Sequence, residues 1–148
     1  MFATIYTDAG GTVKDGENFY SYSYYIKCDK GVSSNTGIIK ESCPDVNYAE
    51  MFCIVEGVKD ALKKFKNIDR ILVVTDSINA QYSLWQGSRH QKYQNIIQEF
   101  RILEEKVDKI MIKWTKGHRS DDSDRAYLNR KCDKRCGVAL KEHFKKNK

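Results

Sequence analysis

Short apolar or alternating segments dominate the N-terminal part of the chain. Residues 2–8 (FATIYTD) and 19–28 (FYSYSYYIKC) are of this kind, and an Asp-Lys-Gly turn leads into a third segment over residues 32–42. We expect a Gly-rich turn at Gly10 and Gly11 between the first two segments. The pattern therefore predicts three strands in an antiparallel meander.

The period of the apolar residues then changes to that of a helix. Residues 47–65 carry an apolar stripe at helical spacing and end in lysines, so we expect a helix there with Asn47 as its cap. A short helix is expected to begin near Ser77 and to end at Gly87. The remaining predicted elements are a buried strand over 71–75, a helix over 91–107, a strand over 109–114 and a helix over 128–144.

This order of elements predicts one α/β domain, a mixed sheet with helices packed on its faces. The chain has 148 residues, 41% hydrophobic and 31% charged, which is enough for one core and argues against disorder. Its apolar runs are too short to span a bilayer, and its N-terminus has no signal-peptide pattern. We therefore expect a single cytoplasmic domain over residues 1–148 that has no membrane partner.

Cysteine and charge usage narrow the picture further. The five cysteines form no Cys-x-x-Cys pair, which is typical of free thiols in a reducing compartment. Cys132 and Cys136 have the spacing of half a zinc site, but without a second pair they are better explained as buried structural thiols. From Lys134 onward there are six Lys or Arg against one Glu, in a chain of net charge +6. This basic C-terminal helix and tail indicates a polyanionic partner, although a solvated helix face explains the charge equally well.

Two of the predicted strands run into the same dipeptide, Thr-Asp. The first strand ends at Asp8 and the buried strand 71–75 is followed by Asp76. Ligands of open α/β sheets bind outside the carboxyl ends of the strands, so neighbouring parallel strands would bring the two carboxylates together. Two like charges at that distance are unfavourable unless a cation neutralises them. A hard divalent ion bound by oxygen ligands is the expected cation.

Three further residues follow the same order along the chain. Glu50 lies in the first turn of the helix from residue 47, where the helix dipole alone would favour an acid. His118 follows the last strand in a Lys-Gly-His turn, and Asp133 lies on the final predicted helix. Each alone is explained as an ordinary surface residue, but the order strand-Asp, helix-Glu, strand-Asp, loop-His, helix-Asp is a more specific pattern.

Five segments carry these residues: YTDAGG, NYAEMFCIVEGVKDAL, VVTDSINA, IKWTKGH and NRKCDKRCGVAL. In this order and spacing they resemble the signature segments of ribonuclease H, type 1, and they extend from residue 6 to residue 140. The resemblance implies the ribonuclease H-like fold, a five-stranded mixed sheet of an antiparallel meander plus parallel strands, with helices on both faces.

The resemblance also implies an activity and its residues. The metal-binding acids are Asp8, Glu50, Asp76 and Asp133, and His118 is the mobile loop histidine that assists product departure or protonates the leaving group. The implied reaction is endonucleolytic hydrolysis of the RNA strand of an RNA–DNA hybrid, leaving a 5′-phosphate and a 3′-hydroxyl. Two Mg²⁺ ions, for which Mn²⁺ would substitute, lie ~4 Å apart in such sites, one activating a water and the other stabilising the leaving oxygen.

Further residues fit the handling of a hybrid, which is distinguished from duplex DNA by 2′-hydroxyls in a wide minor groove. The backbone at Gly10 and Gly11 allows close approach of a strand, and Asn47 offers hydrogen bonds to a sugar or base edge. Tyr82 and Trp85 are placed to stack on a deoxyribose, with core packing an equal alternative for Trp85. We expect no obligate protein partner.

The chain also departs from the family pattern. Members with a basic handle carry an extra helix between the segments matching Asp76 and Trp114, which this shorter and nearly charge-balanced stretch lacks, so the basic tail would supply the grip. Ile78 replaces a polar residue that contacts RNA, and Asp45 lies near the position of a Thr that helps bind a DNA phosphate. The acidic loop 119–128 is interpreted as solvated rather than as an extra metal ligand.

Two other functions compete with hybrid cleavage. One is another nuclease of the same superfamily, such as an exonuclease or a junction resolvase, against which the loop histidine argues. The other is a nucleic-acid-binding module that has lost catalysis. The complete set of acids argues against that alternative, because an inactive site has no reason to keep clustered like charges.

Overall fold

A computed structural model describes residues 1–115 and Lys141, and every structural statement below concerns those residues. The strands are β1 (Phe2–Lys14), β2 (Glu17–Cys28), β3 (Gly31–Ile38), β4 (Arg70–Thr75) and β5 (Lys109–Trp114). The helices are α1 (Val46–Lys64), α2 (Ile78–Gln86) and α3 (Gln94–Glu104), with a 3-10 turn, η1 (Gln91–Tyr93), before α3. The predicted helix 128–144 lies outside the described residues.

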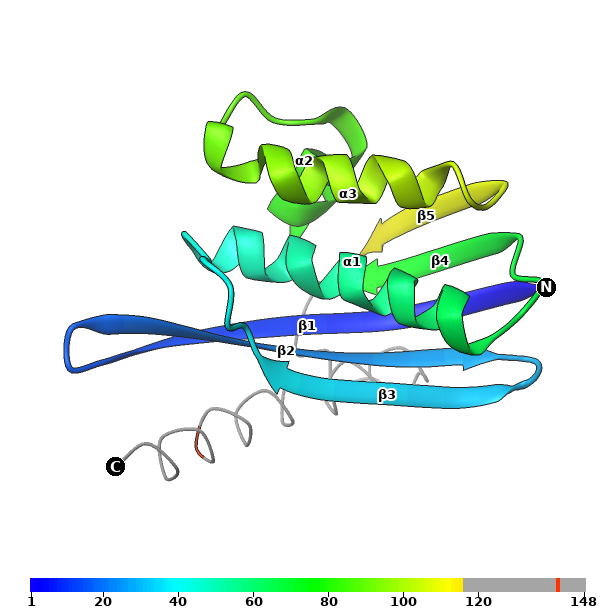
Figure 1. The fold of residues 1–148 in the computed structure, drawn as a ribbon, viewed down its shortest axis with the longest axis horizontal. Helices are drawn as coiled ribbons and strands as arrows, with labels where there is room; N and C mark the ends of the chain where they lie inside the picture. The colour runs from blue at the N-terminus through cyan, green and yellow to red at the C-terminus, as the bar shows by residue number, and fades with distance from the viewer. Residues whose placement is uncertain (116–140, 142–148) are drawn as a thin grey trace.

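The strands form one five-stranded mixed sheet in the order β3-β2-β1-β4-β5 (Figure 1). β1, β2 and β3 pair antiparallel, whereas β4 is parallel to both β1 and β5. The predicted meander and the predicted mixed sheet are therefore confirmed. The chain passes from β3 to β4 through α1. Because β4 joins the sheet parallel to β1, it needs a crossover connection of this kind, which is usually a helix.

The first hairpin is longer than the sequence analysis predicts. Gly10 and Gly11 lie inside β1, opposite Ser21 and Tyr20, so the prediction of a turn at these glycines is wrong. The turn instead falls at Asp15 and Gly16, whose φ values of 54° and 78° suit a two-residue hairpin turn. The glycine at 11 instead lies against an aromatic ring, since a Cβ there would meet the Tyr20 ring at 3.0 Å, a tight contact.

The N-cap of α1 lies two residues earlier than predicted. Asp45, not Asn47, is the N-cap, and its carboxylate accepts a hydrogen bond of 2.9 Å from the Tyr48 amide. Aspartate is one of the best N-cap residues because its short side chain reaches the free amides of the first turn. The predicted helix 91–107 is also shorter than expected, since η1 occupies its first turn and α3 ends at Glu104.

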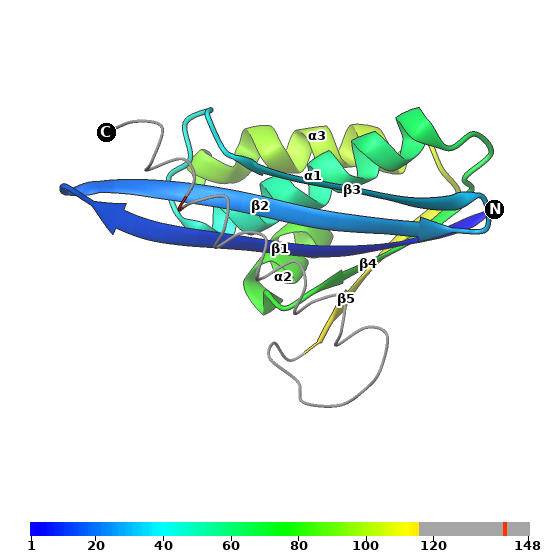
Figure 2. The ribbon, with the colours of Figure 1, turned by 90° about the horizontal axis from the view of Figure 1, so that it is seen from below.

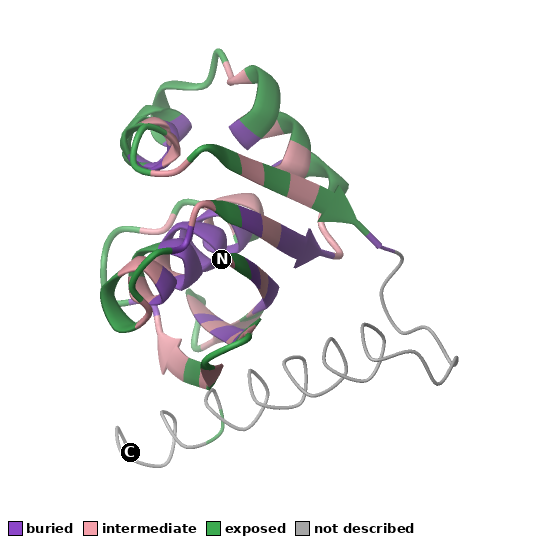
Figure 3. Cartoon of the chain, turned by 90° about the vertical axis from the view of Figure 1, so that its right-hand side faces the viewer, coloured by how far each residue is buried: buried purple, intermediate pink, exposed green. Residues whose placement is uncertain are grey.

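α1 lies across β1 and β2 and packs against α3, so the core forms between these helices and one face of the sheet (Figure 2). Buried positions gather where the helices meet the strands (Figure 3). The largest side chains with almost no exposure include Ile5, Ile26, Met51, Ile54, Leu84 and Phe100. Gly57 allows α1 to pack closely on β1, because a Cβ at residue 57 would meet Ile5 Cγ2 at 3.0 Å.

The described cysteines agree with the expectation of free thiols. Cys28, Cys43 and Cys53 form no disulfide, while Cys132 and Cys136 lie outside the described residues. Burial raises the pKa of the Cys43 thiol to about 11. Within the described ranges, no helix is both long and apolar enough to cross a membrane.

Candidate metal centre

Three acidic side chains from three different elements meet at one point. Asp8 on β1, Glu50 on α1 and Asp76 just after β4 offer carboxylate oxygens that all lie within 4.8 Å of one another. Asp8 and Glu50 are only 5% and 7% exposed, and Asp76 is partly exposed. The cluster is thus closed on the side of the core and open beside Asp76.

The unequal lengths of β1 and β4 explain how Asp8 and Asp76 meet. The parallel pairing of these strands ends at Tyr6 and Val74, and β4 itself ends one residue later, at Thr75. The sequence predicts that Asp8 lies at the end of its own strand. In the structure Asp8 instead lies inside β1, at the place where the neighbouring strand β4 stops. β1 continues past this place paired with β2, and the hairpin projects beyond the ends of β4 and β5 (Figure 1).

The threonine before each aspartate shapes the two chain segments. Thr7 Oγ1 donates to the carbonyl oxygen of Val74 at 3.2 Å, so it links β1 to the end of β4. Thr75 Oγ1 accepts from the amide of Ser77 at 3.1 Å and turns the chain out of β4. Both threonines are buried. The repeated Thr-Asp pair thus combines a structural hydroxyl with an acid at the site.

Asp76 is not the cap of the helix that follows it. Ser77 is the N-cap of α2 and accepts from the Ala80 amide at 3.1 Å. The backbone of Asp76 is held from another direction, since Trp114 Nε1 donates to its carbonyl oxygen at 3.1 Å. The side chain of Asp76 is therefore placed by its surroundings without serving as the helix cap.

The residues predicted to contact substrate are on the same elements as the acids. Gly10 and Gly11 follow Asp8 on β1, and Asn47 lies one turn before Glu50 on α1. Tyr82 is on α2, the helix that begins after Asp76.

The exposed fraction of the Trp85 side chain bears on whether Trp85 packs in the core. Its side chain is 69% exposed, which excludes full core packing, and its ring centroid is 6.2 Å from that of Tyr82, itself 52% exposed. Ile78 is 47% exposed on the same helix. α2 therefore presents an apolar, partly aromatic surface to solvent.

Two of the predicted site residues, His118 and Asp133, lie outside the described residues. Among the described residues, the sequence analysis missed the contacts of Tyr93 and Lys92 with Asp45 at the start of α1. Their signal in the sequence is weak, because a Lys-Tyr pair before a helix does not by itself indicate a partner elsewhere in the chain.

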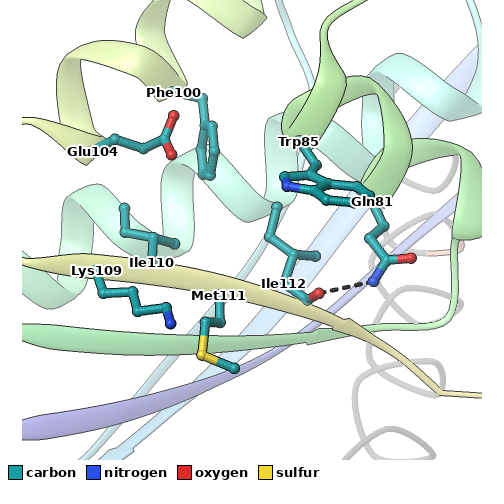
Figure 4. Close-up of a pocket in the computed structure, with 8 residues that line it drawn as sticks. All are labelled: Gln81, Trp85, Phe100, Glu104, Lys109, Ile110, Met111 and Ile112. Atoms are coloured by element: carbon teal, nitrogen blue, oxygen red, sulfur yellow. Dashed lines mark hydrogen bonds between the residues drawn. The ribbon is translucent and has the colours of Figure 1, made fainter.

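A separate hollow of about 320 Å³ lies between α2, α3 and β5 (Figure 4). Gln81 spans its edge and donates from Nε2 to the carbonyl oxygen of Ile112 at 2.8 Å. The other lining residues are Trp85, Phe100, Glu104, Lys109, Ile110 and Met111. None of the three clustered acids lines this hollow, so it is distinct from the candidate metal centre.

Comparisons with known proteins agree with this fold. A family model described as RNase H matches residues 2–141, whereas no curated protein matches the sequence. Among solved structures, RNase H1 from the halophilic archaeon Halobacterium salinarum has a TM-score of 0.73 at 16% identity, covering 96% of this chain and 99% of that one.

Two further structures are similar in fold. LC11-RNase H1, solved in complex with an RNA/DNA hybrid, has a TM-score of 0.67 at 14% identity over 93% of this chain and 99% of that chain. The protease–reverse transcriptase of prototype foamy virus has a TM-score of 0.73 at 20% identity, over 93% of this chain but 20% of the viral one. Because the family model spans nearly the whole sequence, the chain belongs to the RNase H family.

Proposed function

We propose that this protein is an endonuclease that hydrolyses the RNA strand of RNA–DNA hybrids with two divalent metal ions. The family match supports a nuclease acting on such hybrids. The observation that carries the finer proposal is the cluster of Asp8, Glu50 and Asp76, whose oxygens lie within 4.8 Å of one another. The products would carry a 5′-phosphate and a 3′-hydroxyl.

The donor set fits a hard cation. Three carboxylates supply only oxygen ligands, which Mg²⁺ and Mn²⁺ prefer. Holding three like charges this close, two of them buried, is unfavourable in the absence of a cation. When bound, the ions would supply a nucleophile at neutral pH and stabilise charge on the leaving oxygen.

The protein's own residues would orient the acids and the substrate. Asp8 Oδ1 accepts a hydrogen bond from the Ala9 amide at 3.0 Å. This bond fixes the orientation of the carboxylate and therefore also the direction of its second oxygen. Asp133 and His118, outside the described residues, are proposed to complete the acids and to assist product departure. Gly10, Gly11, Asn47 and Tyr82 are proposed to contact the hybrid.

One experiment separates this function from its alternatives. A labelled RNA–DNA hybrid is incubated with the protein beside duplex DNA, duplex RNA and single-stranded RNA, with Mg²⁺, with Mn²⁺ and with EDTA. We expect internal cleavage confined to the RNA strand of the hybrid, and none in EDTA. Equal cleavage of duplex DNA would indicate another nuclease of the superfamily, and binding without cleavage would indicate an inactive module.

The product ends test the chemistry. The downstream RNA fragment, whose 5′ end is created by the cleavage, is treated with a kinase that requires a free 5′-hydroxyl, with and without prior phosphatase treatment. Labelling only after phosphatase treatment is expected, because the 5′ end should carry the phosphate. Direct labelling by the kinase would contradict the proposed bond cleavage.

A further inference from the structure

The first turn of α1 is joined to the segment before α3 by one carboxylate. Asp45 Oδ1 accepts from the Tyr48 amide at 2.9 Å, and Asp45 Oδ2 accepts from the Tyr93 hydroxyl at 2.6 Å. The Lys92 ammonium lies 2.9 Å from the same Oδ2. Asp45 therefore caps α1 with one oxygen and binds η1 with the other.

The Tyr93 hydroxyl is also influenced by a second residue of the same turn. Burial and the bond to Asp45 raise the pKa of Tyr93, whereas the Asn47 side chain lowers it. The Tyr93 side chain that makes the bond to Asp45 is only 6% exposed.

The charge of Asp45 strengthens the connection. Burial alone would raise the pKa of Asp45, but the hydrogen bonds from Tyr93 and Lys92 and the Tyr48 amide together lower it. The carboxylate is therefore ionised at neutral pH and makes charge-assisted bonds, which are stronger than neutral ones.

Glu50 depends on the same turn of α1. It follows Asn47 by three residues, so the two side chains are neighbours on the helix surface. The amides of a first helical turn have no partners within the helix, which makes this turn the part most dependent on external contacts. Mutual repulsion of Asp8, Glu50 and Asp76 would tend to move the turn away.

We propose that Asp45 and Tyr93 are positioning residues, which hold the first turn of α1 so that Glu50 stays beside Asp8 and Asp76. This inference rests on the proposed function for its catalytic consequence, while its effect on metal binding is independent of cleavage. Neither residue is proposed to touch a metal ion or the reacting atoms.

The chain contains a matched control at the other end of the same helix. The Tyr24 hydroxyl donates to Asp60 Oδ2 at 2.7 Å, and Lys64 Nζ donates to the same oxygen at 3.0 Å. Tyr24 is 3% exposed, so it is buried like Tyr93. Tyr93→Phe and Tyr24→Phe therefore each delete one buried tyrosine hydroxyl from an aspartate–lysine pair on or beside α1.

The experiment compares both variants with the wild type in two ways. Melting temperatures are measured without metal and during titration with Mn²⁺, and kcat and KM are measured on a labelled RNA–DNA hybrid. Without metal, the two variants should lose similar stability. With metal, Tyr93→Phe should need about tenfold more Mn²⁺ for half of its stabilisation, near the lower end for groups that orient metal ligands.

The kinetic measurements should also distinguish Tyr93→Phe from Tyr24→Phe. We expect Tyr93→Phe to lower kcat about tenfold, because misplaced catalytic groups act on the chemical step, whereas Tyr24→Phe keeps the wild-type kcat. Asp45→Ser, which keeps a capping hydroxyl but cannot reach Tyr93, should resemble Tyr93→Phe. Asp45→Asn keeps one acceptor oxygen and replaces the other with an amide nitrogen, so it should recover only part of the loss.

The outcomes distinguish this inference from the proposed function. Equal metal titrations and equal kcat for the two phenylalanine variants would overturn the positioning role and leave hybrid cleavage intact. A wild type that cleaves no hybrid but is stabilised by Mn²⁺ would overturn the proposed function, and the titration alone would then decide the role of Tyr93. A wild type with no response to Mn²⁺ would overturn both.

Discussion

The carboxylates of Asp8 and Asp76 come within 4.8 Å of each other because β1 extends past the end of its parallel neighbour β4. Asp8 lies in the continuing strand, and Asp76 lies in the first turn of chain beyond the strand that stops. A buried acid in the middle of a strand has no structural need for a second acid beside it. Their proximity is therefore best explained by a shared ligand.

Asp76→Asn tests this explanation directly. Asparagine keeps the shape of the side chain but removes the charge, so hybrid cleavage should be abolished. Without metal, the variant should be at least as stable as the wild type, since repulsion from Asp8 and Glu50 is relieved. Excess Mg²⁺ should raise the melting temperature of the wild type more than that of the variant, because a ligand at 100 times its Kd stabilises by about 2.7 kcal/mol.

Asp76→Ala serves as the control for a structural role of the acid. Since Ser77 is the cap of α2, losing the Asp76 carboxylate should not remove a cap, and the alanine variant should also fold with near-normal stability. Thermal melting without metal measures both variants. A large loss of stability in both, or near-normal cleavage by Asp76→Asn, would show that the acid is present for the fold.

The exposed aromatic surface of α2 leads to a prediction about substrate affinity. Trp85→Ala should weaken hybrid binding by about 1–3 kcal/mol, the usual contribution of an aromatic ring that stacks on a nucleotide. Its stability should change little, because the side chain is 69% exposed. Fluorescence anisotropy with a labelled hybrid in EDTA measures binding without cleavage.

A matched control for Trp85 is available on α3. Ile102 is 48% exposed on α3, and Ile102→Ala removes apolar surface without removing an aromatic ring. We expect this variant to bind as the wild type does. If Trp85→Ala also binds normally, Trp85 has no role in substrate affinity.

The elements that the sequence predicted well are those with a strong apolar period. α1 and β4 follow from continuous patterns of buried residues. The Asp8–Asp76 pair was expected from the rule that parallel strands end at the same edge, but only β4 ends there and β1 continues past Asp8. The turn at Gly10 was mispredicted because a glycine pair in a strand has the same local signal as one in a turn. In the structure, residue 11 lies inside β1 against the Tyr20 ring, and this close packing explains a glycine at that position.

The contacts at the start of α1 could not be predicted, because they join residues that are distant in sequence. Asn47 and Asp45 both have the residue type of a helix cap, and the hydrogen bond from the Tyr48 amide shows that Asp45 takes this role. Such a choice depends on tertiary contacts rather than on local propensity. His118 and Asp133 stay predictions, since they lie outside the described residues.

The basic C-terminal tail leads to a prediction about salt dependence. A variant that ends before Lys141 should bind the hybrid more weakly and with a smaller dependence on salt, because each lost phosphate contact reduces the logarithmic slope by ~0.9. Cleavage at saturating substrate should change little. Binding measured over a range of NaCl concentrations tests this, and an unchanged slope would mean that the tail is only a solvated end.

The lowered pKa of Asp45 leads to a prediction about acid stability. A carboxyl group whose pKa is lower in the folded state contributes stability above its unfolded pKa, near 4, and loses that contribution as the pH falls through its folded pKa. The difference in unfolding free energy between wild type and Asp45→Ser should therefore be constant above about pH 5 and should shrink below about pH 4.

Urea unfolding of the two proteins at a series of pH values measures this difference. Serine also caps helices well, so the comparison reports the bonds of Asp45 to Tyr93 and Lys92 rather than the cap itself. If the difference were the same at pH 3 as at pH 7, Asp45 would stabilise the fold through packing, and the charged bonds to η1 would contribute nothing.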